Sequence, residues 1–167
     1  MIPITIPGRI LRFLEQRANL AFAGTRNREL VPCGHRVSGW VVGADGRSIT
    51  ALVAAHFTAN LVDSLQDNGA LALTVEEFPS HETYQFKGHF RHHRAVRDED
   101  LEVVARIRDR FLKSARHIYT DAPEHVLNAY IVAPVMAVEF EVREIYLQTP
   151  GPGAGIRLVP PVEPGPL

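Results

Sequence analysis

Two glycines and several polar residues are packed into one strand-like stretch, "VPCGHRVSGW" (31–40). Gly34 and Gly39 would weaken a β-strand unless another group has to approach its backbone closely. His35 and Arg36 could bind an anion, but adjacent strand residues point to opposite faces, so only one of the two can line a given groove. The stretch is therefore either a strand that cradles a ligand or an ordinary strand with a solvated polar face.

The other side chains of this stretch leave the same alternatives open. Ser38 and Trp40 are expected to share a strand face with Arg36, and the indole ring could stack on a planar ligand or could equally belong to the core. Cys33 could act as a nucleophile beside His35. No acid that would orient such a pair is near in sequence, so a lone buried thiol is favoured.

A second set of polar residues alternates along "ETYQFKGHF" (82–90). Thr83, Gln85 and Lys87 fall on one face of the expected strand. Lys87, directly before Gly88, is a candidate partner for an anion. The alternative is a polar outer face that contacts only solvent.

The histidines of "GHFRHHR" invite a test for a metal site. Ligands on one strand would stand at alternate residues, and His89, His92 and His93 do not keep that spacing. No aspartate or glutamate falls among them. We therefore expect no metal site, but a basic strand exit that could form a weak anion-binding rim.

Hydrophobic periodicity predicts the elements that position these residues. The region 134–148 alternates cleanly as a half-buried strand, and Thr58 can cap a helix. The expected helices are 7–18, 56–69, 97–119 and 122–130. The expected strands are 19–25, 30–42, 48–54, 70–77, 82–90 and 134–148. Because the first strands are joined by hairpins, we predict a mainly antiparallel small β-barrel with helices packed outside.

The length and composition of the chain indicate which class of protein it belongs to. The chain has 167 residues, 46% hydrophobic and 22% charged, which is typical of one globular domain. We expect that domain at 1–150 and a Pro/Gly-rich tail at 151–167 that runs extended over the surface. The net charge of −1 gives no electrostatic case for nucleic acid or an anionic membrane as a partner. With neither a signal-peptide pattern nor a membrane-length apolar run, the expected location is the cytoplasm.

Four segments in this order carry a resemblance to a known family: "GADGRSITA", "TANLVDSLQDNG", "TYQFKGHF" and "VEFEVREIYLQTPGPGAG". Their order and spacing, over roughly residues 15 to 155, resemble the FMN-binding split barrel of the pyridoxamine 5'-phosphate oxidase-like superfamily. The resemblance implies a homodimer with FMN in a groove at the dimer interface. It also implies that "GHRVSGW" runs beside the flavin, with the backbone from Val37 to Gly39 near the ring edge.

The resemblance implies a set of cofactor-binding residues on the second strand, at the start of the following helix and on later strands. These are His35, Arg36, Val37, Ser38, Gly39, Trp40, Thr58, Asn60, Thr83, Lys87 and Gln148. His35 and Trp40 stand where the oxidases have an arginine and a lysine. Ala59, Asn60 and Leu61 stand where the oxidases have Ser-Arg-Lys. The sequence shows no counterpart of the basic substrate clamp of pyridoxamine-phosphate oxidase, so the resemblance does not extend to that enzyme's activity, and it assigns no catalytic residue or substrate.

Two classes of function follow from this pattern. The first is an FMN-dependent oxidoreductase, in which the flavin carries the redox chemistry and the protein positions it. The second is a non-catalytic flavin or haem carrier or sensor on the same barrel, in which a histidine could be an axial haem ligand. The missing arginine and lysine keep the second class open.

Overall fold

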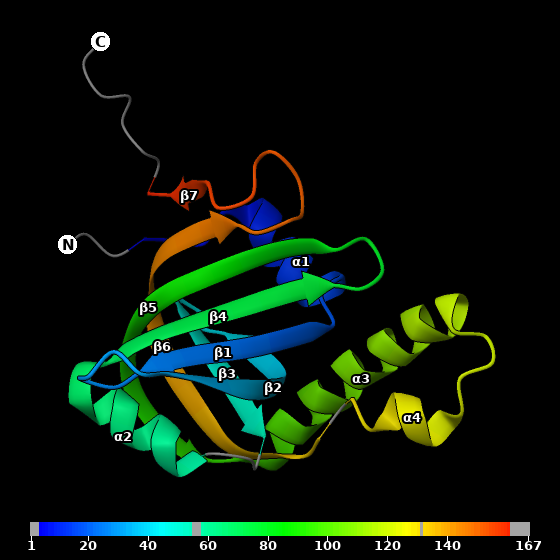
Figure 1. The fold of residues 1–167 in the computed structure, drawn as a ribbon, viewed down its shortest axis with the longest axis horizontal. Coiled ribbons are helices and arrows are strands. Elements are labelled where there is room, and N and C mark those ends of the chain that lie inside the picture. Colours follow the sequence, from blue (N-terminus) through cyan, green and yellow to red (C-terminus); the bar gives the residue numbers. More distant parts are fainter. Residues whose placement is uncertain (1–3, 55–57, 131, 161–167) are drawn as a thin grey trace.

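Antiparallel strands form a closed barrel in the computed structural model of the chain, which describes residues 4–54, 58–130 and 132–160. The strand order is β3-β2-β1-β4-β5-β6-β7, and β3 also pairs with β6, which closes the barrel (Figure 1). Each pairing is antiparallel, as the hairpin links predicted. The strands are β1 (Leu20–Arg26), β2 (Pro32–Val42), β3 (Ser48–Ala54), β4 (Ala70–Glu77), β5 (Glu82–Ala95), β6 (Pro134–Leu147) and β7 (Arg157–Val159).

Helices pack outside this barrel, which confirms the predicted fold class. They are α1 (Gly8–Gln16), α2 (Thr58–Asn68), α3 (Asp98–Ile118) and α4 (Glu124–Asn128). Figure 1 shows that α3 begins against the barrel and that its far end projects away from it, with α4 alongside. In the part of the chain that the structure describes, no helix is long and apolar enough to cross a membrane.

The barrel interior is filled by the apolar face of each strand. On β6, Val138, Phe140 and Val142 are buried, whereas Glu139 and Glu141 are only partly covered, as the alternating sequence predicted. Phe86 and Leu73 fill the interior from the neighbouring strands. Burial of these side chains supplies the main driving force for closing the barrel.

Among the register shifts of the sheet, the β-bulges at Ser38 and at Arg143 change which residues share a face near the predicted site. On β2, Val37 pairs with Val53 and Gly39 with Leu52, so that Ser38 is an extra residue. Between β5 and β6, Lys87 pairs with Glu144 and Gly88 with Val142, so that Arg143 is an extra residue. A Cβ atom on Gly88 would lie 2.1 Å from the Glu141 carbonyl oxygen, so this crossing requires a glycine.

The chain turns back after β6 and adds β7 to the sheet. Leu147 donates its backbone N–H to the Ile156 carbonyl at 2.9 Å, and Gly155 donates to the Leu147 carbonyl at 2.7 Å. Leu158 and Val159 pack against the barrel core. The segment expected to run extended over the surface therefore contributes a short strand, while residues 161–167 lie outside the described part.

Candidate functional site

The outward-facing residues of β2, β1, β4, β5 and β6 form aligned rows across the barrel wall. One row runs through Gly34, Gly24, Ala72, Lys87 and Glu144. The adjacent row runs through Arg36, Phe22, Thr74, Gln85 and Tyr146. We call this surface the outer sheet face.

A groove crosses the first of these rows. It consists of two adjoining hollows, of about 490 and 390 Å³, that share Ala70, Lys87 and Gly88. A Cβ atom on Gly24 would meet nothing within 4 Å, so the floor there is open. We call it the Lys87 groove, lined by Gly24, Thr25, Arg26, Pro32, Ala70, Leu71, Ala72, Lys87, Gly88, His89, Arg143 and Glu144.

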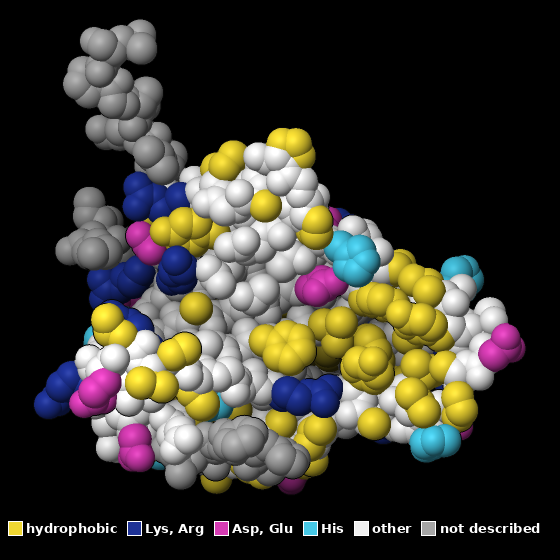
Figure 2. Space-filling model, in the orientation of Figure 1, with side chains coloured by type: hydrophobic (Ala, Val, Ile, Leu, Met, Phe, Trp, Pro, Cys, Tyr) yellow, Lys and Arg dark blue, Asp and Glu magenta, His cyan; other side chains and the backbone are white. Residues whose placement is uncertain are grey.

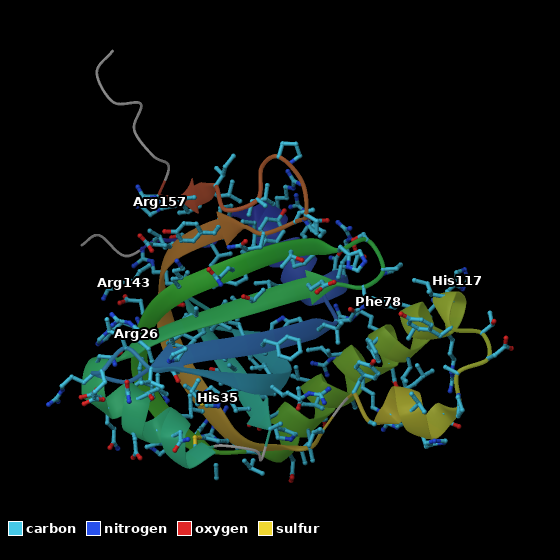
Figure 3. The ribbon with its side chains drawn as sticks, viewed as in Figure 1. Arg26, His35, Phe78, His117, Arg143 and Arg157 are labelled. Atoms are coloured by element: carbon cyan, nitrogen blue, oxygen red, sulfur yellow. The ribbon has the colours of Figure 1, made fainter. Side chains whose placement is uncertain are left out.

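The Lys87 groove is rich in cationic side chains. Basic side chains gather at the edge of the barrel where β5, β6 and β7 bend (Figure 2). Arg26 and Arg143 both lie along this edge (Figure 3). Lys87 forms no ion pair with a carboxylate of the described residues, and its Nζ lies 4.4 Å from the centre of the Tyr146 ring. The nearest cross-strand carboxylate, Glu144, instead accepts hydrogen bonds from Tyr146 at 3.1 Å and Arg157 at 3.3 Å.

Arg143 alternates outward with Glu139 and Glu141 on β6, and the bulge places it between Glu144, which pairs with Lys87, and Val142, which pairs with Gly88. One guanidinium nitrogen lies 2.5 Å from Glu141 Oε2, which fixes the side chain. Its Nε atom is buried and has no hydrogen-bond partner among the described residues. A buried donor without a partner costs free energy, so Arg143 has capacity for a further acceptor.

The histidine and the arginine of the opening stretch lie on opposite sides of β2. His35 faces the barrel interior, where its Nε2 lies 3.2 Å from Thr25 Oγ1. Burial disfavours the charged imidazole and lowers the pKa of His35. Arg36 lies on the outer sheet face, and its guanidinium donates to the carbonyl oxygens of Ala129, at 3.4 Å, and Tyr130.

The next residues of β2 pack against other elements of the protein. Val37 is buried in the core, and the Ser38 hydroxyl donates to the Val132 carbonyl oxygen. Gly39 lies beneath α3, and Trp40 is buried with its Nε1 donating to the Leu14 carbonyl at 3.2 Å. In this structure, the group that approaches the backbone closely at Gly39 is helix α3.

The remaining predicted site residues lie at other places. Asn60 is exposed on the first turn of α2, and the side chain of Thr58 lies outside the described part. Thr83 and Gln148 line a separate hollow of about 410 Å³, where the Gln148 backbone N–H donates to the Thr83 carbonyl at 2.8 Å. Of the predicted residues, Lys87 lines the groove and Arg36 shares its outer face, while the hollow at Thr83 and Gln148 is also lined by Thr74 and Gln85 of that face.

Four groove or face residues were not predicted from the sequence. Phe22, on β1, is 54% exposed and stands in the row beside the groove. Arg26 and Arg143 supply cations, and Tyr146 contacts Lys87 through its ring. The alternation of β1 and β6 indicates that Phe22 and Arg143 face outward. It does not indicate which residues lie beside them, because that depends on how the strands pair.

An apolar cleft lies between the barrel and the α3–α4 pair, where hydrophobic side chains gather in Figure 2. Its volume is about 280 Å³. Phe78 stacks on Tyr119 with ring centres 6.0 Å apart, and Phe111 lies 5.6 Å from the Tyr130 ring. We call it the aromatic cleft; Leu20, Phe78, Phe111, Tyr119, Ala122, Val126, Leu127 and Tyr130 line it.

The histidines of β5 are dispersed. His89 lines the Lys87 groove, whereas His92 lies 3.8 Å from Glu139 and His93 stacks on Phe90 with ring centres 6.2 Å apart. Within the described ranges, no group of three or more His, Cys, Asp or Glu side chains is placed to hold a metal ion.

Comparisons with protein-family models and with curated protein sequences give no match. Among solved structures, HupZ from Group A Streptococcus superposes with a TM-score of 0.51 at 11% identity, over 90% of this chain and 100% of that one. A candidate pyridoxamine 5'-phosphate oxidase from Lactobacillus delbrueckii has a TM-score of 0.50 at 10% identity, over 85% and 93%. An FMN-binding protein from Syntrophomonas wolfei has a TM-score of 0.47 at 12% identity, over 80% of each chain. At such identities the likeness shows the fold alone, which is a split β-barrel with helices packed outside.

Proposed function

We propose that the protein binds FMN non-covalently in the Lys87 groove. The observation that carries this proposal is a pair of uncompensated donors, Lys87 Nζ and Arg143 Nε, at the edge of a flat floor of small residues. A phosphate dianion offers acceptors for both donors, and a planar ring system can lie against a floor without side chains.

The groove residues fit the two halves of FMN. Lys87 and Arg143 would hold the phosphate, with Arg26 and His89 adding positive charge at the rim. The ring system would lie along Gly24 and Ala72, towards the second row of the outer sheet face.

The flavin would supply the electron-transfer chemistry, so the proposed class of activity is an oxidoreductase. This chain's part is to bind and orient the cofactor and to exclude water from one side of it. No groove residue has the arrangement of an acid–base pair that would identify a substrate.

We further propose that a second copy of the chain covers the outer sheet face and the aromatic cleft, which meet where Arg36 donates to the Tyr130 carbonyl oxygen. Phe22, Tyr119 and Tyr130 each expose about half of their surface, at 54%, 52% and 52%. Exposed apolar groups gathered on one side of a protein typically mark an interaction surface. A partner protomer there would complete a two-sided groove around the cofactor.

An absorbance spectrum of the purified protein, followed by titration with FMN, tests the proposal. We expect flavin absorbance in the purified protein, or saturable quenching of FMN fluorescence after reconstitution. Colourless protein that does not bind added FMN would refute it.

Haem is the second candidate cofactor, because His89 presents an exposed imidazole at the rim of the same groove. A neutral imidazole is a common axial ligand of haem iron. A Soret band that is lost in a His89→Ala variant would favour haem over FMN. The same spectrum therefore separates the two cofactors.

A further inference from the structure

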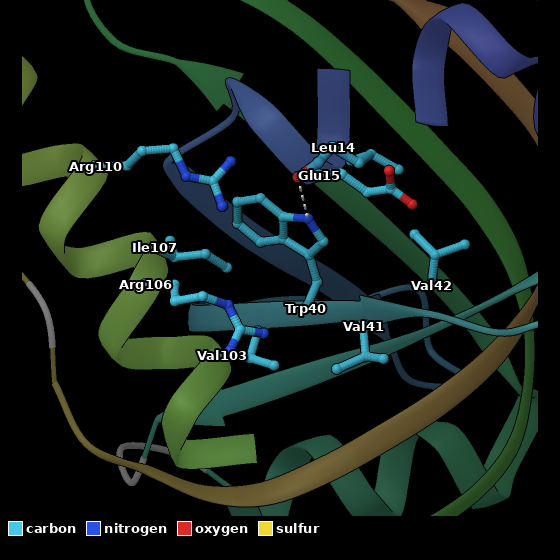
Figure 4. Close-up of a pocket in the computed structure, with 9 residues that line it drawn as sticks. All are labelled: Leu14, Glu15, Trp40, Val41, Val42, Val103, Arg106, Ile107 and Arg110. Atoms are coloured by element: carbon cyan, nitrogen blue, oxygen red, sulfur yellow. Dashed lines mark hydrogen bonds between the residues drawn. The ribbon is translucent and has the colours of Figure 1, made fainter. Parts of the chain in front are cut away.

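A second cleft, of about 280 Å³, lies between α1, β2 and α3 (Figure 4). Trp40 and Ile107 form its apolar wall, and Arg106 and Arg110 reach it from α3. It shares no lining residue with the Lys87 groove. We call it the Trp40 cleft.

The two arginines of the Trp40 cleft lie one helical turn apart. Residues four positions apart on a helix are neighbours on one face, so the two positive charges repel each other. Figure 4 shows the Arg110 guanidinium directed towards the indole ring of Trp40. Burial, and in addition the charge of Arg106, lowers the pKa of Arg110.

Neither charge is compensated by the described residues. Arg106 and Arg110 take part in no ion pair within 4 Å there, although Glu15 also lines the cleft. In Figure 4 the Glu15 carboxylate lies on the far side of the indole ring from Arg110. One guanidinium nitrogen of Arg110, Nη1, is buried without a hydrogen-bond partner among the described residues. Elsewhere in the molecule the partly buried Arg94 is paired through both nitrogens with Asp100, at 2.6 and 3.0 Å.

We propose that the Trp40 cleft binds a small organic anion, whose phosphate or carboxylate group is held by Arg106 and Arg110 and whose apolar part contacts Trp40 and Ile107. A planar guanidinium matches the geometry of both kinds of oxyanion. Such a ligand provides the acceptor that the buried Arg110 nitrogen lacks. The apolar wall favours an anion with a ring or alkyl group over an inorganic ion.

Trp40 is the single tryptophan of the chain, so its fluorescence reports directly on this cleft. The probes are phenyl phosphate, benzoate, inorganic phosphate and the uncharged benzyl alcohol, each titrated into the wild-type protein. We expect a saturable change in emission with phenyl phosphate or benzoate and none with benzyl alcohol. Whichever of phenyl phosphate and benzoate binds with the higher affinity identifies the preferred oxyanion.

Three glutamine variants test the role of the arginines. Arg110→Gln and Arg106→Gln should each weaken binding of the preferred anion by about tenfold or more, because each loses hydrogen bonds to a charged group. Arg106 is exposed, so its replacement leaves the core intact. The matched control is Arg108→Gln, which removes one positive charge from the same helix at an exposed residue that contacts Asn128 and lies outside the cleft.

The proposal is overturned if neither aromatic anion gives a saturable response at millimolar concentration. It is also overturned if all three variants bind equally, because binding would then reflect only the overall charge of α3. Lys87→Gln should leave this response unchanged, which separates the test from that of the FMN proposal.

Discussion

A Cβ atom on Gly39 would lie 3.2 Å from Cγ2 of Val104, because helix α3 packs directly on the backbone of β2. The same atom would lie 3.4 Å from Ile107 Cδ1. The glycine that stands out in the sequence is therefore explained by the contact between a strand and a helix.

Replacing Gly39 with valine should push α3 away from the barrel. We expect Gly39→Val to lower the free energy of unfolding by about 1–3 kcal/mol, the usual cost of overpacking a filled contact. Urea denaturation measures the change. An unchanged midpoint would mean that α3 is not packed on Gly39.

Gly24 offers the opposite case on the outer sheet face, where an added Cβ meets nothing within 4 Å. Gly24→Val should leave the fold stable, because valine is favoured in strands. It should also weaken FMN binding by about tenfold or more, because its branches would occupy the groove floor. Normal FMN affinity in this variant would place the cofactor elsewhere.

Stability should depend on the protonation of His35. Its pKa is lowered in the fold, so the unfolded chain binds the proton more readily, at its ordinary pKa of about 6.5. The contribution of neutral His35 to the free energy of unfolding is therefore complete above that pH, and it is lost as the pH falls below it. The slope is at most about 1.4 kcal/mol per pH unit. Denaturation of wild type and His35→Gln from about pH 7.5 to about pH 5.5 measures the difference. Equal slopes in both proteins would contradict it.

The oligomeric state should depend on Phe22. Phe22→Glu places a charge in the centre of the proposed interface, and burying an unpaired charge is costly, so we expect light scattering to show monomers in place of dimers. Leu101→Glu, at a residue that is 46% exposed on α3, is the control and should leave the dimer intact. A monomeric wild-type protein, or a dimeric Phe22→Glu variant, would rule out this interface.

The elements of the fold were predictable because their signals are local. The alternation of β6 and the helical spacing of Val104, Ile107 and Phe111 in α3 each follow from neighbours in the sequence. Strand β7 was not predicted, because its few residues lie between prolines and glycines and depend on pairing with β6.

The candidate site was predictable only in part, because it depends on register. Strand alternation predicts Lys87 as an outward-facing candidate, and Lys87 lines the groove. The neighbours of Arg143 depend on a β-bulge. Because of this bulge, Gly88 pairs with Val142 in place of Arg143. The bulge at Ser38 likewise places Ser38 against Val132 and Trp40 against the core, contrary to a face shared with Arg36.

The dissociation constant of FMN for wild type and Lys87→Gln tests the central claim most directly. We expect saturable binding by wild type and a loss of about 1.5–3 kcal/mol in the variant, roughly a tenfold to hundredfold weaker affinity. Lys113→Gln, which removes an exposed cation from α3, is the control and should bind FMN as wild type does. Equal affinity of all three proteins, or no binding by wild type, would contradict the account.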